Sequence, residues 1–243
     1  MQNIMDNILF PKEITVTGQQ IDISHFSDKQ KDFVINFTAN LLTYYHELQK
    51  DRMVVGIAGP SGAGKSLLAA LVKKLTQKVP IVPLSIDAFH FSNLQLEQRS
   101  DGDGITLKDR KGRYDTYDVG ALEQKLKKFT SGENVAFPEY SRKLHEPILD
   151  ATIVANGPCI LIVEGLWLLY EDAGWQHIQQ YLDRTYFLND EPAKLRSHTI
   201  ARHILGGRSP EDAERQYDAS DAKNYELLIQ TRTRADEELT WNS

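Results

Sequence analysis

An eight-residue segment that combines glycines with a lysine and a serine is the strongest chemical signal in the chain. It reads G-P-S-G-A-G-K-S and comprises Gly59, Pro60, Ser61, Gly62, Ala63, Gly64, Lys65 and Ser66. Glycines let backbone N–H groups approach phosphate oxygens without a Cβ atom in between, and a following helix adds partial positive charge. The pattern predicts that Lys65 reaches the β- and γ-phosphates of a nucleotide and that the Ser66 hydroxyl binds Mg²⁺. The alternative is a glycine-rich turn without a ligand, which the complete match makes the weaker interpretation.

Two carboxylates follow segments that are predicted to be buried strands. Asp87 follows the apolar run 81–86, and Glu164 follows the apolar run 159–163. Because ligands bind beyond the carboxyl ends of the strands in an open α/β sheet, both side chains are expected to face the phosphates. Asp87 suits a base that accepts a proton from a hydroxyl, and Glu164 suits a ligand of Mg²⁺ or of its waters. The alternative for each is a carboxylate that caps a helix or a loop.

A basic stretch that includes Arg202 and Arg208 surrounds the pair Gly206-Gly207. By charge pattern alone, such a stretch is most often a solvated helix face. Phosphoryl transfer, however, needs cations around the transferred group, and a closing segment often supplies them. The sequence leaves both interpretations open.

Apolar periodicity predicts four buried strands that alternate with helices. The strands cover 53–58, 81–86, 159–163 and 184–188. This alternation is typical of a parallel sheet with helices on both faces, the three-layer α/β/α class.

The first fifty residues precede this pattern. Residues 14–16 and 21–23 are predicted to form a small hairpin around the turn 17–20, and Ser27 is predicted to cap a long amphipathic helix. The expected organisation is a hairpin and helix, 1–50, packed on a phosphate-binding-loop domain, 51–243.

The composition excludes several other classes of protein. The chain has 243 residues, 41% hydrophobic and 26% charged, so it can bury a full α/β core without disulfides. Asp and Glu outnumber Lys and Arg by 34 to 28, which argues against a dedicated nucleic-acid binder. The single cysteine, Cys159, fits a reducing, cytoplasmic compartment. No apolar run approaches the ~20 residues of a membrane-spanning helix, and residues 1–10 do not have the pattern of a signal peptide.

Six short segments occur in an order that resembles a known enzyme family. They are residues 59–66, S-I-D-A-F-H at 85–90, K-G-R-Y-D-T-Y-D at 111–118, P-E-Y-S-R at 138–142 with E-P at 146–147, I-V-E-G at 162–165, and G-R-S at 207–209. Together they resemble the uridine kinase, phosphoribulokinase and bacterial pantothenate kinase family. The likeness extends from about Val54 to Asp236 and is nearest to pantothenate-kinase-like proteins, including kinases associated with fructose transport.

The resemblance implies a fold and several residue roles. The fold would be that of a nucleoside-kinase-like P-loop NTPase with an inserted acceptor-binding region and a helical lid. By resemblance, Asp87 is the base, Glu164 holds Mg²⁺, and Arg202 and Arg208 are lid arginines that act with Lys65 in catalysis.

The resemblance also implies that His90, Tyr140 and Arg142 border the phosphoryl acceptor. Two departures lie in the acceptor segments: Tyr114 stands where the family has Pro, and Ser141 stands where it has Asp. The identity of the acceptor is therefore not carried over from the family.

The leading hypothesis is a kinase that uses ATP and Mg²⁺ to phosphorylate a hydroxyl of a small metabolite such as a sugar, a nucleoside or a pantothenate-like compound. The alternative is a P-loop ATPase or regulatory nucleotide-binding protein without a small acceptor. A GTPase is disfavoured because the Asn-Lys-x-Asp motif is missing. Neither hypothesis involves nucleic acid or a membrane. The sequence determines neither the acceptor nor the oligomeric state, and a homodimer stays open.

Overall fold

A five-stranded parallel sheet forms the centre of the computed structural model, which describes residues 10–142 and 144–241. The strand order is β4-β7-β3-β8-β9, and every neighbouring pair is parallel. The strands are β3 (Arg52–Ala58), β4 (Ile81–Ser85), β7 (Cys159–Gly165), β8 (Arg184–Asn189) and β9 (Glu237–Thr240). The four predicted strands are all present. The short edge strand β9, E-E-L-T, was not predicted, because four mostly polar residues carry no apolar run.

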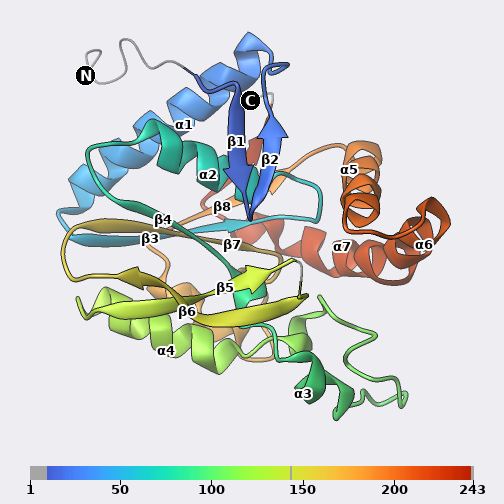
Figure 1. The fold of residues 1–243 in the computed structure, drawn as a ribbon. Helices are drawn as coiled ribbons and strands as arrows, with labels where there is room; N and C mark the ends of the chain where they lie inside the picture. Colours follow the sequence, from blue (N-terminus) through green and yellow to red (C-terminus); the bar gives the residue numbers. More distant parts are fainter. Residues whose placement is uncertain (1–9, 143, 242–243) are drawn as a thin grey trace.

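Helices cover both faces of this sheet (Figure 1). α1 (Asp28–Leu48) and α2 (Lys65–Leu75) share one core with Val55 and Ile57 of β3. α4 (Val119–Thr130) shares the opposite core with Val54 of the same strand. Neighbouring residues of β3 thus enter different cores, as a strand buried on both faces requires. The predicted three-layer α/β/α class is confirmed.

The N-terminal hairpin packs beside α2. Its strands are β1 (Glu13–Val16) and β2 (Gln19–Asp22), joined by Thr17 and Gly18. Both joining residues have positive φ, 47° and 80°, as a two-residue hairpin turn requires. The predicted turn 17–20 was therefore two residues too long. The predicted helix cap at Ser27 is confirmed, because its hydroxyl accepts a hydrogen bond from the Gln30 N–H.

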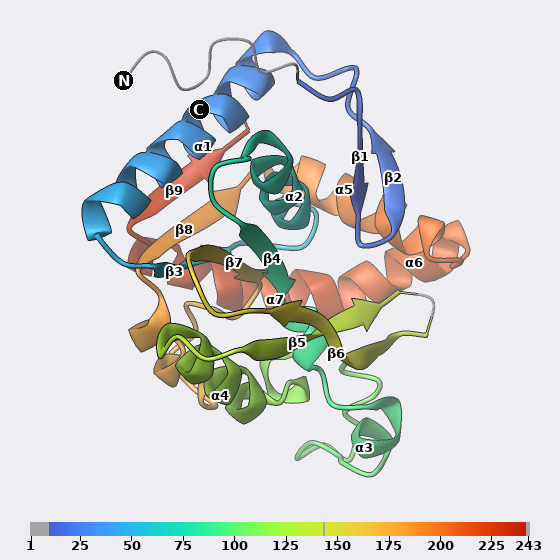
Figure 2. The ribbon, with the colours of Figure 1, turned by 60° about the vertical axis from the view of Figure 1, so that its left-hand side comes forward.

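A second hairpin, β5 (Val135–Ser141) and β6 (Glu146–Val154), extends below the sheet (Figure 2). It was not predicted, because β6 is mostly exposed and shows no alternation of buried and exposed residues. Its root is tied to the central sheet by Arg52, the first residue of β3. The buried Arg52 guanidinium donates to the carbonyls of Phe129, Glu133, Ala155 and Gly157, which lie just before β5 and just after β6.

The C-terminal third carries a group of helices at the edge of the fold (Figure 1). α5 (Pro192–Leu205) ends at Gly206-Gly207, and Ser209 caps α6 (Pro210–Gln216), both as predicted. A π-helical segment, Tyr217–Asp221, leads into α7 (Ala222–Leu228). The polar excursion between β4 and α4 contains the short helix α3 (Asn93–Glu97). Short 3₁₀ segments occur at Ile86–Phe89, Tyr114–Thr116, Trp175–His177, Gln179–Tyr181 and Ile229–Arg234.

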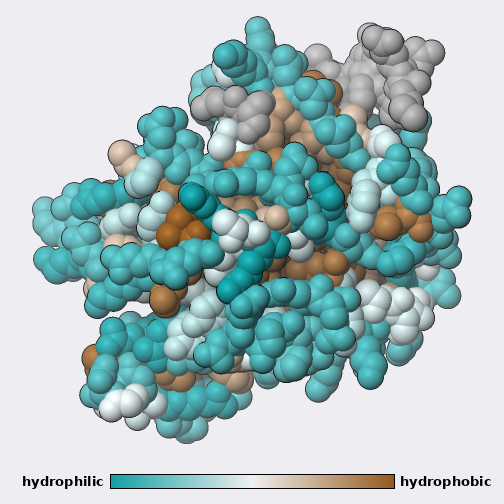
Figure 3. Space-filling model, turned by 180° about the vertical axis from the view of Figure 1, so that it is seen from behind, coloured by the Kyte–Doolittle hydropathy of each residue, from teal (hydrophilic) through white to brown (hydrophobic). Residues whose placement is uncertain are grey.

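The surface seen from behind is mainly hydrophilic, with hydrophobic residues in separate patches (Figure 3). Within residues 10–142 and 144–241, no helix combines the length and the apolar character needed to cross a membrane.

Candidate active site

The P-loop (residues 59–66) connects the end of β3 to the start of α2. Gly59 has φ 151°, and a Cβ atom there would lie 2.1 Å from the Leu188 carbonyl oxygen, so a side chain cannot be accommodated. Lys65 opens α2, and its Nζ donates to the carbonyls of Gly59 (2.8 Å) and Pro60 (2.9 Å). The loop is therefore folded around its own lysine, at the carboxyl end of the central strand.

Charged groups converge on Lys65. The side chain is buried, and its pKa is lowered to about 8 from the usual 10.5, chiefly by burial. The Glu164 and Asp87 carboxylates oppose this lowering of the pKa, and the Arg202 guanidinium contributes to it. A nucleotide phosphate would add negative charge beside this buried ammonium and stabilise its charged form. The structure thus brings Lys65, Asp87, Glu164 and Arg202 to one place.

Glu164 and Ser66 form a direct pair. The Ser66 Oγ donates to Glu164 Oε1 at 2.8 Å. Glu164 was expected just after its strand but lies within β7, because the backbone pairing continues past it, opposite Ile57 of β3 and Ser85 of β4. Burial raises the pKa of Glu164, and Lys65 partly offsets this. A buried carboxylate beside a hydroxyl is thus poised to gain from a nearby cation.

This pair of oxygen ligands fits Mg²⁺. Mg²⁺ prefers hard oxygen ligands and is usually held by one or two protein groups, with phosphate and water completing its shell. Among the residues that the structure describes, no group of three or more His, Cys, Asp or Glu side chains is arranged to hold a metal. Ser66 and Glu164 therefore suit a cation that arrives with a nucleotide.

Asp87 lies on the 3₁₀ turn Ile86–Phe89 at the end of β4, which is separated from the P-loop strand β3 by β7. Ser85 caps this turn by accepting from the Asp87 N–H, so the Asp87 carboxylate is not the cap. The carboxylate instead accepts a hydrogen bond from the Tyr117 hydroxyl at 3.4 Å. Gly165 permits this placement, since a Cβ atom there would lie 2.2 Å from the Ile86 side chain. The geometry favours the functional interpretation of Asp87 over a capping role.

His90 lies directly beside this carboxylate. Its ring is buried and stacks on Tyr117 at 3.9 Å between centroids, with Tyr140 at 5.7 Å. Nδ1 lies 2.9 Å from the Asp87 backbone carbonyl, which only accepts, so Nδ1 carries the proton. Burial lowers the pKa of His90, so the ring is neutral at pH 7 and Nε2 is an acceptor. Nε2 has no hydrogen-bond partner in the described part of the chain.

Tyr140 and Arg142 lie at the tip of the β5–β6 hairpin. Burial raises the pKa of Tyr140 to about 12, so its hydroxyl stays protonated. Arg142 Nε donates to the Thr17 hydroxyl at 2.8 Å. This bond joins the tip of β5–β6 to the turn of the N-terminal hairpin, and Figures 1 and 2 show the two hairpins meeting there. The structure thus groups His90 with Tyr140, while Arg142 is engaged by the N-terminal hairpin.

The two proposed lid arginines lie in different surroundings. Arg202 on α5 is half-buried and acts on Lys65, as described above. Arg208 is exposed beyond the end of α5. The pKa of Asp212 on α6 is lowered mainly by hydrogen bonds from Ser209 and Arg215, and Arg208 adds a smaller contribution. Of these two arginines, Arg202 is the one whose charge acts on the P-loop lysine, and the role of Arg208 stays a prediction.

Sequence reasoning missed a cavity of about 430 Å³ beside the P-loop. Its lining combines residues 62–64 of the P-loop with residues 21–23 of the N-terminal hairpin, Lys194 and His198 of α5, and Trp241. Trp241 Nε1 donates to the Ala63 carbonyl at 2.7 Å. No local motif announces this lining, because it is assembled from both ends of the chain.

Lys111 was noted in the sequence only as part of a motif. Its Nζ donates to Asn93 Oδ1 (2.8 Å) and to the His145 carbonyl (2.5 Å), and it lies 5.6 Å from the centre of the Tyr140 ring. It also lies near enough to Asp87 and His90 for its charge to act on both. The signal that identifies it, a lysine without a carboxylate partner, is visible only in three dimensions.

The chain is similar to several known proteins. The model described as "Phosphoribulokinase / Uridine kinase family" matches residues 54–236. The uncharacterized protein YggC of Escherichia coli (strain K12) is 32% identical over 231 residues, which cover 92% of each chain. The pantothenate kinase of Limosilactobacillus reuteri subsp. reuteri is 31% identical over 145 residues, which cover 57% of this chain and 45% of that enzyme.

A solved structure from Silicibacter sp. TM1040, provisionally assigned as a fructose transport system kinase, is similar over most of the chain. The TM-score is 0.75 at 25% identity, and the match covers 85% of this chain and 98% of that one. The cavity-lining hairpin and Trp241 lie outside the matched family segment.

Proposed function

Because the chain belongs to the phosphoribulokinase and uridine kinase family, we propose that it is a kinase that transfers the γ-phosphoryl group of ATP to a hydroxyl of a small metabolite. The observation that carries the proposal is the position of Asp87. Its carboxylate is free of the cap, acts on Lys65 on one side, and contacts Tyr117 beside His90 on the other. It therefore lies between the P-loop and a set of polar groups that the P-loop chemistry does not use.

In the proposed reaction, the acceptor hydroxyl gives its proton to the Asp87 carboxylate as its oxygen attacks the γ-phosphorus. The new oxygen–phosphorus bond forms while the bond from the γ-phosphorus to the bridging oxygen breaks, and ADP leaves. Lys65 and Arg202 balance the negative charge on the transferred group. Little covalent chemistry is left to the protein, so positioning and charge carry the catalysis.

Mg²⁺ would be held by Ser66 and Glu164, and when bound it would neutralise charge on the phosphate oxygens. The chain's own contribution is to keep these two oxygens aligned beside Lys65. Their hydrogen bond orients the serine hydroxyl toward the carboxylate.

The cavity beside the P-loop supplies a place for the nucleoside part of ATP. It adjoins residues 62–64 of the P-loop, and its wall includes the aromatic ring of Trp241. In this proposal the N-terminal hairpin is part of the nucleotide site, which gives residues 10–26 a function beyond packing.

The test is acceptor-dependent ADP release. We would measure ADP release with ATP and Mg²⁺, alone and with nucleosides, pantothenate, ketohexoses, glycerate and pentose phosphates. A kinase is slow alone and accelerates with the correct acceptor, and the phosphorylated product is identified by mass spectrometry. Rapid ADP release that no acceptor changes would support the alternative, an ATPase without a small acceptor.

A further inference from the structure

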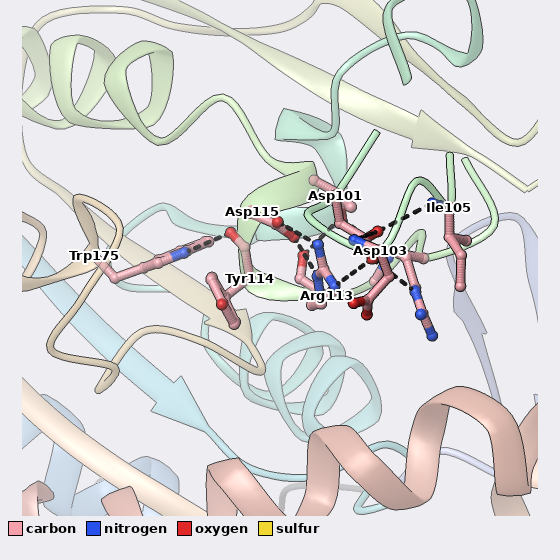
Figure 4. A network of polar contacts seen from close by, with 10 residues as sticks. Asp101, Asp103, Ile105, Arg113, Tyr114, Asp115 and Trp175 are labelled. Atoms are coloured by element: carbon pink, nitrogen blue, oxygen red, sulfur yellow. Dashed lines mark hydrogen bonds and ion pairs between the residues drawn. The ribbon is translucent and has the colours of Figure 1, made fainter. Parts of the chain in front are cut away.

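The loop between α3 and α4 is rich in cations, and two of them, Arg110 and Arg113, pair with carboxylates of the same loop. Asp101 accepts hydrogen bonds from the backbone of Asp103 (3.0 Å) and Ile105 (3.1 Å), and it pairs with Arg110 and Arg113. Arg113 also makes a two-pronged pair with Asp115, at 2.7 and 2.6 Å. Figure 4 shows this network, with Trp175 bound to the Tyr114 carbonyl. These charges hold the loop in shape.

Lys111 lies between Arg110 and Arg113 in sequence and behaves differently. In the described part of the chain, no carboxylate lies within ion-pair distance of its ammonium. Two of its three N–H donors are used, by Asn93 and by the His145 carbonyl, which leaves one donor for a ligand. Burial lowers the pKa of Lys111, which means that its charge is incompletely solvated.

The surroundings of Lys111 point toward the acceptor region. Tyr140 lies under its ammonium, and the charge of Lys111 acts on His90, whose Nε2 is buried without a partner. Glu146 is the carboxylate whose charge acts most on Lys111, and its Oε1 already accepts from the Asn93 backbone N–H at 2.8 Å. Two kinds of recognition are thus available together: a hydrogen-bond acceptor for a hydroxyl and a cation for an anion.

We propose that Lys111 determines substrate class by binding a negatively charged group, a carboxylate or a phosphate, on the molecule whose hydroxyl Asp87 activates. The inference rests on the proposed kinase function. The loop network around Asp101 positions Lys111, and the guanidinium of Arg142, which also has no described ion pair, lies near Tyr140 and adds to the local positive charge. The acceptor is therefore a hydroxy acid or a phosphorylated polyol rather than a neutral sugar or nucleoside.

The first experiment compares acceptors that differ in charge alone. The pairs are pantothenate and pantothenol, glycerate and glycerol, and ribose 5-phosphate and ribose, with kcat/KM measured from ADP release. We expect turnover with the charged member of one pair, and the responding pair distinguishes a carboxylate from a phosphate. Lys111→Met keeps the stem over Tyr140 and should lower kcat/KM for that charged acceptor by about 10- to 100-fold, as for loss of a charged hydrogen bond, while the neutral member changes little.

Lys108→Met is the matched control, because Lys108 lies in the same loop but pairs with the exposed Glu97. Its kcat/KM should equal that of the wild type. A preference for neutral acceptors, or an equal loss of both members of a pair in Lys111→Met, would overturn the inference.

A binding measurement separates this inference from the proposed function. With ADP and Mg²⁺ saturating the P-loop, acetate and methyl phosphate serve as probes at matched ionic strength. At least one of them should raise the thermal unfolding temperature of the wild type more than that of Lys111→Met. Equal shifts in both proteins overturn the anion assignment, whereas absence of turnover with every acceptor counts against the kinase itself.

Discussion

The phosphate side and the acceptor side of the site differ in how their polar groups are satisfied. On the phosphate side, Lys65 is bound by the carbonyls of its own loop and Ser66 by Glu164. On the acceptor side, His90 Nε2 has no partner in the described residues and Lys111 keeps a free donor. The polar groups of the first arrangement bind one another, whereas the second leaves an acceptor and a donor open to a ligand.

This difference separates the residues proposed to bind the phosphoryl donor from the residues proposed to bind the acceptor. The phosphate side lies at the end of the central strand β3 and the start of α2, and Glu164 is held by backbone pairing within β7. The acceptor side is built from a loop and a hairpin that are not part of the central sheet. A site of this kind can change acceptor while keeping the same phosphoryl donor.

The largest expected effect is that of Lys65→Met on the phosphate side. We expect turnover to fall by more than ~10³-fold, because one uncharged donor in such a position already contributes about 10²- to 10³-fold. Because the pKa of Lys65 is about 8 when folded and 10.5 when unfolded, the unfolded chain binds more protons between these values. The free energy of unfolding of the ligand-free wild type should therefore rise with pH from about 8 to 10.5, relative to the variant. Chemical denaturation across this range measures it, and parallel curves for the two proteins would contradict the buried ammonium.

Asp87→Asn tests the group at the boundary of the two sides. Asparagine keeps the size and the contact to Tyr117 but cannot take a proton, so kcat should fall by about 10²- to 10⁴-fold. ATP affinity should stay within a few-fold. A collapse of ATP affinity would instead assign Asp87 to the phosphate side.

Arg202→Ala and Arg208→Ala compare the two lid arginines directly. Arg202 already lies by Lys65, so its loss should lower kcat by about 100-fold. Arg208 is exposed, so we expect it to stabilise the charge of the transferred group less than Arg202 does. Its loss should lower kcat by about tenfold. Equal losses would mean that the lid closes far enough to bring both arginines to the transferred group, and protease protection by a non-hydrolysable ATP analogue would map that movement.

Glu164→Gln tests cation binding while keeping the shape of the side chain. The Mg²⁺ concentration for half-maximal activity should rise by about 10- to 100-fold, because an oriented carboxylate near a metal contributes that much to affinity. KM for the acceptor should stay the same. An unaltered Mg²⁺ titration would remove Glu164 from the metal site.

The smallest effect is expected for Thr17→Val, which removes the hydroxyl that binds Arg142 and preserves the β-branch at a positive φ. Loss of one exposed hydrogen bond should raise KM for the acceptor by about 2- to 5-fold. Thr15→Val, on the exposed face of β1, is the matched control. Identical KM values for the two variants would show that the contact between the hairpins has no role in acceptor binding.

The sequence predicted the phosphate side better than the acceptor side, for a physical reason. Residues 59–66 and the carboxylates Asp87 and Glu164 each come directly after an apolar run that is visible in the sequence alone. The two-stranded hairpin β5–β6 is exposed over much of β6 and leaves no such pattern. The free donor of Lys111 and the cavity next to the P-loop depend on contacts between distant segments, which no local spacing encodes.

Arg52 anchors one end of the β5–β6 hairpin. Arg52 is the first residue of β3, and its hydrogen bonds to four carbonyls attach the root of the hairpin to this strand. The opposite end is the tip, where Ser141 pairs with Glu146, and it carries Tyr140 and Arg142. The placement of Tyr140 and Arg142 therefore depends on contacts at both ends of the hairpin: the four Arg52 hydrogen bonds at its root and the Arg142–Thr17 hydrogen bond at its tip.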